Sequence, residues 1–386
     1  MKKKWLIGLG AGLLAASRAF ALSVPAPALD ANAWLLLDAK SDEIIAAHNA
    51  DARIQPASLT KIMTAYLVFQ AIRSHRLSLD QTVTVSTQAW KVAPDSSKMF
   101  LKPGDRVTVE QLLDGLLVDS GNDAAVALAQ ATAGSVGAFV VAMNQMAGRM
   151  GLTSTHFASP HGLPDPQTYS SARDLSQLAR RLIRDFPQLY TRFDTTKQYT
   201  YDKITQRNRN GLLWLDDSVD GLKTGHTTEA GYCLIASARR PGADLERRLI
   251  SVVLGAPSSK ARVQESETLL NWGFGNFDTV KLYSKQQVVA SPRVWKGAQD
   301  QVPVGFTHNV YLTVARGENR IGAPKVTTPG PVIAPVAADS PVASLTERIG
   351  DRTVTLPLVA LRPVAPAGVF GRAWDSVALW VSSLKG

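Results

Sequence analysis

The chain of 386 residues is 45% hydrophobic and 19% charged, which is typical of a globular protein with one large domain and a smaller one. A single cysteine, Cys233, excludes an intrachain disulfide framework and any site built from paired cysteines. The formal net charge of +10 is scattered, with no basic run interleaved with aromatic residues, so the sequence predicts no nucleic-acid partner.

The first 21 residues have the pattern of an export signal. Lysines occupy positions 2–4, an apolar run covers 5–16, and Ala19 and Ala21 offer small residues for cleavage. Because the apolar run is shorter than the ~20 residues of a comfortable membrane span, we predict a cleaved signal peptide over residues 1–21 and not an anchor helix. Its removal takes four basic residues with it, so the formal net charge falls from +10 to +6.

The next part of the chain mixes strands and helices. Residues 33–49 predict two strands joined by a polar turn, and a helical run begins near Ser58. A short strand is expected over 82–85. Apolar residues recur at helical spacing over 109–133, but Gly121 in "DSGND" predicts a tight turn that divides this stretch into two helices. Two further helices are expected over 136–150 and 171–186, the second with Ser171 as its N-cap.

Strands return after these helices. Three strand-like runs cover 219–225, 231–240 and 248–256, and a helix is expected over 262–272. The thiol of Cys233 lies in the second run, where a buried and inert cysteine is expected. Helices in the middle with strands at both ends predict an α/β (α+β) domain over 28–281, whose sheet is assembled from both ends of the domain.

A second, smaller all-β domain is expected over 282–362. Its runs alternate apolar and polar residues without a helical period, and its middle, 324–343, is rich in proline and predicts an extended loop or edge. The domain carries no cluster of acidic or histidine residues and no glycine-rich phosphate loop. It therefore presents no chemistry of its own.

The last segment, 366–386, predicts an amphipathic helix. At about 100° per residue its apolar side chains, including Trp374 and Trp380, fall within an arc of about 140°, and only Leu379 interrupts the polar face. Such a helix could dock on the protein's own core. Its place after a proline-spaced linker and its two tryptophans favour a monotopic anchor on a membrane surface.

The stretch "QPASLTKIMTAYL" places Ser58 and Lys61 three residues apart, on one face of the predicted helix. A lysine serves as general base only where burial or a neighbouring cation lowers its pKa. The spacing alone is weak evidence, because Ser382 and Lys385 repeat it at the end of the chain. A catalytic reading of Ser58 therefore needs further motifs.

Two tripeptides supply them. "SGN" (120–122) lies at the predicted break between helices, where side chains can enter a cleft, and "KTG" (223–225) lies on a predicted strand. On an edge strand, Lys223 would provide the positive charge that Lys61 needs, and Gly225 would let a substrate backbone approach. The order SxxK, SxN, KTG is the specific signal.

This ordered set resembles the penicillin-binding proteins and serine β-lactamases. The stretches "PASLTKIMTA", "LLVDSGNDAA", "FASPHGLPD", "SSARDL", "NRNGLLW" and "VDGLKTGHTTEAGYCLIASA" are similar to the low-molecular-mass D-alanyl-D-alanine carboxypeptidases. The resemblance covers almost the whole mature chain. It implies a β-lactamase/transpeptidase-like catalytic domain, a small β domain and an amphipathic tail helix.

The resemblance also implies roles for single residues. Ser58 would attack the carbonyl of the penultimate D-Ala and form an acyl-enzyme, Lys61 would accept its proton, and Ser120 would relay a proton to the leaving D-Ala. The substrate-binding set would be Asn122, Lys223, Thr224, Gly225, His226 and Arg262, with Thr224 and Arg262 at the terminal carboxylate and the N–H groups of Ser58 and His226 as the oxyanion hole. His161, Asp174 and Arg209 have weaker claims, and we expect structural roles for the first two.

The function implied is removal of the terminal D-Ala from peptidoglycan stem peptides ending in D-Ala-D-Ala, without a cofactor or metal. β-Lactam antibiotics would be covalent inhibitors. We expect a periplasmic enzyme attached peripherally to the inner membrane, with a homodimer as an open alternative. The competing readings are a D,D-endopeptidase, a β-lactamase, or a non-hydrolytic protein that binds β-lactams or peptidoglycan. The sequence offers no glutamate placed for fast deacylation, which argues against a β-lactamase. The intact motif set argues against a non-hydrolytic binding protein.

Overall fold

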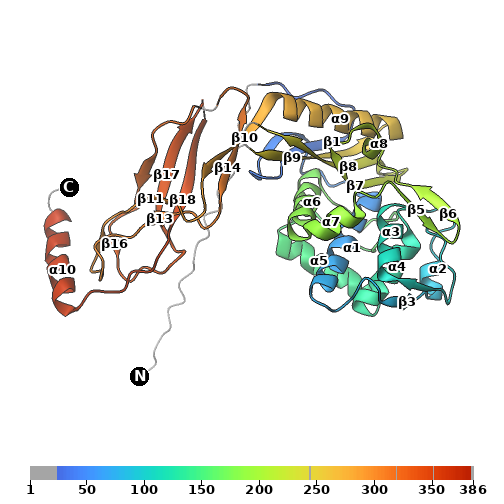
Figure 1. The fold of residues 1–386 in the computed structure, drawn as a ribbon, viewed down its shortest axis with the longest axis horizontal. Coiled ribbons are helices and arrows are strands. Elements are labelled where there is room, and N and C mark those ends of the chain that lie inside the picture. Colours follow the sequence, from blue (N-terminus) through green and yellow to red (C-terminus); the bar gives the residue numbers. More distant parts are fainter. Residues whose placement is uncertain (1–23, 243–244, 319, 351, 384–386) are drawn as a thin grey trace.

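The computed structural model describes residues 24–242, 245–318, 320–350 and 352–383, which form a mixed α/β domain, an all-β domain and a terminal helix (Figure 1). The predicted signal peptide lies outside the described residues. The predicted fold class, an α/β catalytic domain followed by a smaller all-β domain, is confirmed.

A five-stranded antiparallel sheet in the order β2-β1-β9-β8-β7 forms the centre of the first domain. Its strands are β1 (Ala33–Asp38), β2 (Ile44–His48), β7 (Val219–Thr227), β8 (Gly231–Pro241) and β9 (Glu246–Ala256). The strands therefore come from both ends of the domain, as predicted. Strand β7, which carries "KTG", lies at an edge of the sheet.

Both faces of this sheet are buried, so β1 is apolar at nearly every position. Leu35 and Leu37 enter the core on one face, and Trp34 and Leu36 enter a separate core on the other. The first core is shared with most of the helices, and α9 (Ser259–Asn276) covers the second face (Figure 1). The motif residues lie on the helical side of the sheet.

The helices on that side follow the predicted order. They are η1 (Ala57–Thr60), α1 (Lys61–Arg73), α3 (Val109–Leu117), α4 (Asn122–Ala133), α5 (Val136–Met150) and α6 (Ala172–Asp185). Ser171 caps α6 as predicted, because its Oγ accepts a hydrogen bond from the N–H of Asp174. Helix α9 begins earlier than expected because Ser258 caps it in the same way, accepting from the N–H of Ala261.

Several short elements lacked a sequence signal strong enough to predict them. They are α2 (Thr87–Trp90), α7 (Pro187–Phe193), α8 (Leu212–Leu215), β4 (Arg106–Thr108), which pairs with β3 (Thr82–Thr84), and the hairpin of β5 (Gln198–Tyr201) and β6 (Ile204–Arg207). The hairpin turn uses Asp202 and Lys203, both at positive φ, and Lys203 stands where glycine is usual.

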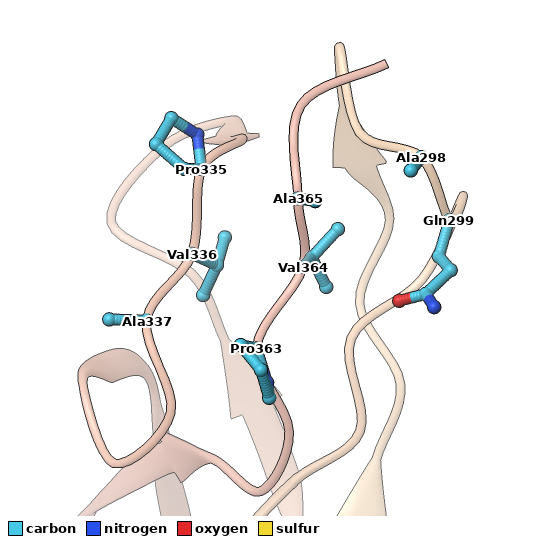
Figure 2. A pocket seen from close by; sticks show the side chains of 8 residues that line it. All are labelled: Ala298, Gln299, Pro335, Val336, Ala337, Pro363, Val364 and Ala365. Carbon is cyan, nitrogen blue, oxygen red and sulfur yellow. The ribbon is translucent and has the colours of Figure 1, made fainter.

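The β domain contains a five-stranded sheet, β11-β13-β18-β17-β15, and the pairs β10-β14 and β12-β16. Their bounds are β10 (Phe277–Tyr283), β11 (Val288–Ala290), β12 (Val294–Trp295), β13 (Val304–Gly305), β14 (Val310–Ala315), β15 (Lys325–Thr327), β16 (Val332–Ile333), β17 (Pro341–Ile349) and β18 (Arg352–Ala360). The proline-rich middle contributes only the short strands β15 and β16. A hollow of about 430 Å³ is lined by residues of the segments 298–299, 335–337 and 363–365. Figure 2 shows Val336 and Val364 on two of these segments, which an isolated β-bridge joins. The lining of the hollow has no titratable side chain.

Helix α10 (Val369–Ser383) ends the described chain. Its apolar residues Phe370 and Trp374 are 92% and 75% exposed, whereas Asp375 is turned toward the β domain, where it accepts a hydrogen bond from the N–H of Lys296. Leu379, one turn after Asp375, is half-buried, so the residue that interrupted the polar face lies on the docked side. Within the described ranges no single helix is long and apolar enough to cross a membrane; only the sharply bent pair α4–α5 meets that test by length and composition.

Candidate active site

Ser58 and Lys61 meet at the start of α1. Ser58 lies in the 3₁₀ turn η1, and Lys61 is the first residue of the α-helix that follows, so the two side chains lie on one face. The distance between Ser58 Oγ and Lys61 Nζ is 2.9 Å. The structure thus brings the two residues of the first motif into hydrogen-bond contact.

The Lys61 amine has two further partners. Nζ lies 2.6 Å from Asn122 Oδ1 and 2.9 Å from the carbonyl oxygen of His161, and the side chain is fully buried. A neutral amine has two N–H donors and one lone pair. Because the amide and carbonyl oxygens can only accept, they take both hydrogens and leave the lone pair for the O–H of Ser58.

The surroundings favour this neutral form. Burial lowers the pKa of Lys61 well below its usual value, and the positive charges of Lys223 and Arg209 lower it further, against an opposing effect of Asp123. The positive charge that was expected beside Lys61 is therefore supplied by Arg209 and, when its amine is protonated, by the predicted Lys223. Arg209 is exposed in the loop that follows β6, and from there it donates to Ser97 Oγ at 2.7 Å.

Lys223 is buried on edge strand β7. Burial, Arg209 and Arg262 together lower its pKa to about 7. Two residues later the strand passes close to the nucleophile: a Cβ atom at Gly225 would lie 2.9 Å from the Pro56 carbonyl oxygen and 3.2 Å from Ser58 N. Glycine is needed there because the strand and the Ser58 turn approach each other backbone to backbone.

Ser120 lies in the turn between α3 and α4, and Asn122 is the first residue of α4. Ser120 adopts a φ of 60°, an uncommon conformation for a residue with a side chain. The N–H of Gly121 donates to Gly115 O and that of Asn122 to Ser97 O, which fixes the turn on both sides. The next residue, Asp123, accepts from the N–H groups of Met99 and Leu101 and so ties the turn to the loop that carries Ser97.

Thr224, His226 and Arg262 complete the predicted set. Thr224 is buried beside Lys223, and His226 is exposed with its ring stacked 3.9 Å from that of Tyr232. Arg262 donates to the carbonyl of Gly225 at 3.1 Å and to Ser259 Oγ at 3.2 Å, so it supports the end of "KTG" from behind. Its buried Nε has no hydrogen-bond partner in the described part of the chain.

The residues with weaker claims have structural contacts. His161 presents its backbone carbonyl to Lys61, while burial and the Lys61 charge lower the pKa of its ring to about 4. Asp174 accepts from Ser154 N and Thr155 Oγ1 and contacts no lysine of the site. Ser97 was missed by the sequence reading, because a serine in the loop "DSSK" carries no motif.

Comparison with known proteins extends the likeness to the whole chain. The family model described as D-alanyl-D-alanine carboxypeptidase matches residues 20–258, and the model of the C-terminal domain of penicillin-binding protein 5 matches residues 277–365. D-alanyl-D-alanine carboxypeptidase DacC of Escherichia coli is 42% identical over 385 residues, covering 96% of this chain and 95% of that protein. DacD of Salmonella typhimurium is 44% identical, with 90% of each chain covered.

Solved structures agree. The crystal structure of penicillin binding protein 5 from Haemophilus influenzae superposes with a TM-score of 0.84 at 39% identity, covering 89% of this chain and 99% of that one. Penicillin binding protein 6B from Escherichia coli gives a TM-score of 0.72 at 40% identity, with the same coverage. Similarity therefore extends over both domains and not over the motifs alone.

Proposed function

Because the chain belongs to the D-alanyl-D-alanine carboxypeptidase family, we propose that it is a serine-type hydrolase that removes the terminal D-Ala from peptidoglycan stem peptides. The observation that supports this most is the Lys61 amine, which is buried 2.9 Å from Ser58 Oγ and has Asn122 Oδ1 and the His161 carbonyl oxygen as its other two partners. This geometry suits a covalent mechanism in which a lysine is the base.

Acylation follows from that arrangement. The Ser58 hydroxyl gives its proton to Lys61 Nζ as its oxygen attacks the carbonyl carbon of the penultimate D-Ala. The peptide bond breaks as Ser120 gives its hydroxyl proton to the departing D-Ala nitrogen and takes the proton back from Lys61, which becomes neutral again. The shortened peptide is left as an ester on Ser58. The N–H groups of Ser58 and His226 would hold the oxyanion, and one such donor is typically worth ~3 kcal/mol of barrier.

Substrate binding uses the edge strand. A stem peptide that runs beside β7 would place its terminal carboxylate near Thr224, Lys223 and Arg262, where positive charge gathers, and would offer its amide to Asn122. Water then attacks the ester, with Lys61 again taking the proton. A β-lactam presents a carboxylate and a reactive carbonyl in the same relation, so it would acylate Ser58 and act as a covalent inhibitor.

The relatives favour hydrolysis of a terminal D-Ala over the competing readings. Both curated relatives described above are named D-alanyl-D-alanine carboxypeptidase, and the alignments cover 95% and 90% of their lengths. The solved neighbour with the TM-score of 0.84 is a penicillin-binding protein. The endopeptidase, β-lactamase and non-hydrolytic readings lack comparable support.

The deciding experiment measures D-alanine release from a peptide ending in D-Ala-D-Ala, using the full chain beside its Ser58→Ala variant. We expect release by the parent and none by the variant, with both proteins folded. Equal release by both would reject Ser58 as nucleophile. Absence of release by the parent, with cleavage of cross-linked dimers in its place, would assign the endopeptidase activity.

We further propose that α10 holds the enzyme on the periplasmic face of the inner membrane. The helix exposes Val369, Phe370, Trp374 and Val377, while Asp375 docks the opposite side on the β domain. Aromatic side chains on an apolar helix face suit the membrane interface. A helix docked in this way would fix the orientation of the β domain on the lipid and hold the catalytic domain away from it.

A further inference from the structure

Two buried ionisable side chains near the cleft lack adequate partners. Lys223 is 2% exposed, and among the described residues its Nζ forms one hydrogen bond, to the carbonyl of Thr224 at 3.2 Å. Asp194 is 1% exposed, and neither of its carboxyl oxygens has a hydrogen-bond partner in the described chain. Burying either charge without a partner costs several kcal/mol, so the pair calls for an explanation.

The fold places both side chains in one layer. Gly221, Lys223 and Gly225 alternate along β7 and so share a face, and Lys223 lies opposite Ile235 of the helical-side core. A Cβ atom at Gly225 would point at the Ser58 turn, and one at Gly221 would lie 2.6 Å from Tyr190 Oη of α7. The Lys223 side chain therefore extends between β7 and the layer formed by α7 and the Ser58 turn.

Asp194 enters this layer from the other side. It directly follows α7, and its N–H donates to the carbonyl of Tyr190 at 2.9 Å, so it lies one turn beyond Tyr190 on the same helix face. That face is the one that packs on β7 near Gly221. Asp194 is thus directed toward the strand that carries Lys223.

Two of the other carboxylates of this region, Asp220 and Asp123, are already engaged. Asp220 accepts from Tyr190 Oη and from Arg248 and Arg239, and Asp123 accepts three backbone N–H groups. Asp119, beside Ser120, is buried with one unpartnered oxygen. The cations that face Lys223 are Arg209, Arg262 and Lys61, so the unpaired carboxyls are its available counter-charges.

The electrostatics agree with the geometry. Burial, Arg209 and Arg262 lower the pKa of Lys223, and Asp194, followed by Asp119, opposes them. Burial raises the pKa of Asp194 well above its usual value, Asp220 adds to this, and Lys223 opposes it. One proton shared between the two groups keeps the pair neutral overall and avoids two isolated buried charges.

We propose that Asp194 is a positioning residue for Lys223: the two side chains share one proton, which moves from the Asp194 carboxyl to the Lys223 amine when an anionic substrate terminus enters the cleft. The O–H bond of Asp194 breaks, an N–H bond forms on Lys223, and a carboxylate and an ammonium result. The substrate carboxylate favours the ammonium form of Lys223 because this carboxylate would lie nearer to Lys223 than to Asp194. This inference deepens the proposed function and rests on it.

The first test is the pH profile of D-alanine release by the full chain and its Asp194→Asn variant. Asparagine keeps the shape and removes the proton site, so we expect the alkaline limb of kcat/KM to move to lower pH by about one unit, mainly through KM. The matched control is Asp114→Asn. Asp114 is also a buried carboxyl with an unpartnered oxygen, but its charge is not among those that act on Lys223. In the Asp114→Asn variant the alkaline limb of kcat/KM should stay at the pH of the parent enzyme.

A second measurement does not depend on that variant folding. Infrared difference spectra of full-length Ser58→Ala protein, taken before and after addition of a D-Ala-D-Ala peptide, should show loss of the C=O stretch of a protonated buried carboxyl. An unchanged carboxyl band, or an alkaline limb that Asp194→Asn leaves where it was, would overturn the proposal. A parent enzyme that releases no D-alanine at any pH would instead reject the proposed function itself.

Discussion

Asn122 Oδ1 lies 2.6 Å from Lys61 Nζ, closer than the serine that the lysine serves. The amide oxygen accepts one amine hydrogen, and the His161 carbonyl accepts the other. Asn122 therefore helps to set the direction of the lone pair, in addition to any contact with substrate. The side chain at position 122 must therefore be uncharged as well as able to accept a hydrogen bond from Lys61.

Asn122→Asp should shift the acid limb of activity. A carboxylate at this distance would raise the pKa of Lys61, so the base would be protonated at neutral pH and regain activity only as pH rises. We expect kcat/KM at pH 7 to fall at least about 100-fold, with the acid limb displaced upward by about one to three units. Asn122→Ala should reduce activity without moving that limb. A limb that stays in place in Asn122→Asp would contradict the assignment.

Lys61→Arg should abolish acylation while preserving the positive side chain. A guanidinium cannot be deprotonated in a protein, so it has no lone pair for the Ser58 proton. We expect labelling by a fluorescent penicillin to slow at least about 1,000-fold, consistent with the general-base role. Ser382→Ala, in the second serine–lysine spacing of the sequence, is the control and should label at the parent rate. Normal labelling of Lys61→Arg would exclude Lys61 as the base.

Gly225→Ala tests the close approach of β7 to the nucleophile. Its methyl group would lie 2.9 Å from Pro56 O and 3.2 Å from Ser58 N, so the strand or the turn must move. We expect acylation to slow by about 100-fold, because small displacements from reactive geometry are costly. Gly148→Ala is the matched control. Nothing lies within 4 Å of its added methyl group in α5, and it should stabilise the protein by about 0.5–1 kcal/mol, measured by denaturant unfolding.

His161 should make the protein sensitive to mild acid. Burial and the Lys61 charge lower the pKa of its ring to about 4 from 6.5. Below about pH 6.5 the unfolded chain binds a proton at His161, whereas the folded chain does not bind it until about pH 4. The free energy of unfolding therefore decreases as pH falls through this window. The cost between pH 7 and pH 5 is roughly 2 kcal/mol. His161→Gln should lose less of its free energy of unfolding over the same interval; an identical loss would assign the acid sensitivity elsewhere.

Membrane attachment should depend on the exposed face of α10. Replacing Phe370 and Trp374 with serine removes two large apolar side chains, each worth about 1.5–3 kcal/mol when fully buried in an apolar phase. We expect co-sedimentation with anionic vesicles to fall at least about 10-fold, with D-alanine release from soluble peptide unchanged. Ser376→Ala should bind like the parent. Full binding by the Phe370→Ser, Trp374→Ser protein would reject the lipid contact.

Much of the fold was readable from local pattern. The break at Gly121, the Ser171 cap and the helix over 136–150 depend on residues within a few positions of one another, so the sequence predicted them. Helix α7 and the β5–β6 hairpin were missed. The first is short and begins at Pro187, and the second turns at Asp202 and Lys203 without the glycine that marks such turns.

The candidate site divides in the same way. The sequence by itself determined which side chains could carry the chemistry, because Ser58, Lys61, Ser120 and Lys223 stand in short motifs whose order is readable along the chain. Only the tertiary structure decided that Arg209 acts on both lysines, that the His161 backbone completes the partners of Lys61, and that Asp194 is buried without a hydrogen-bond partner among the described residues. The physical reason is the separation along the chain over which each effect acts. Hydrophobic periodicity and helix caps depend on residues a few positions apart. Desolvation and charge depend on segments that come together only in the folded domain.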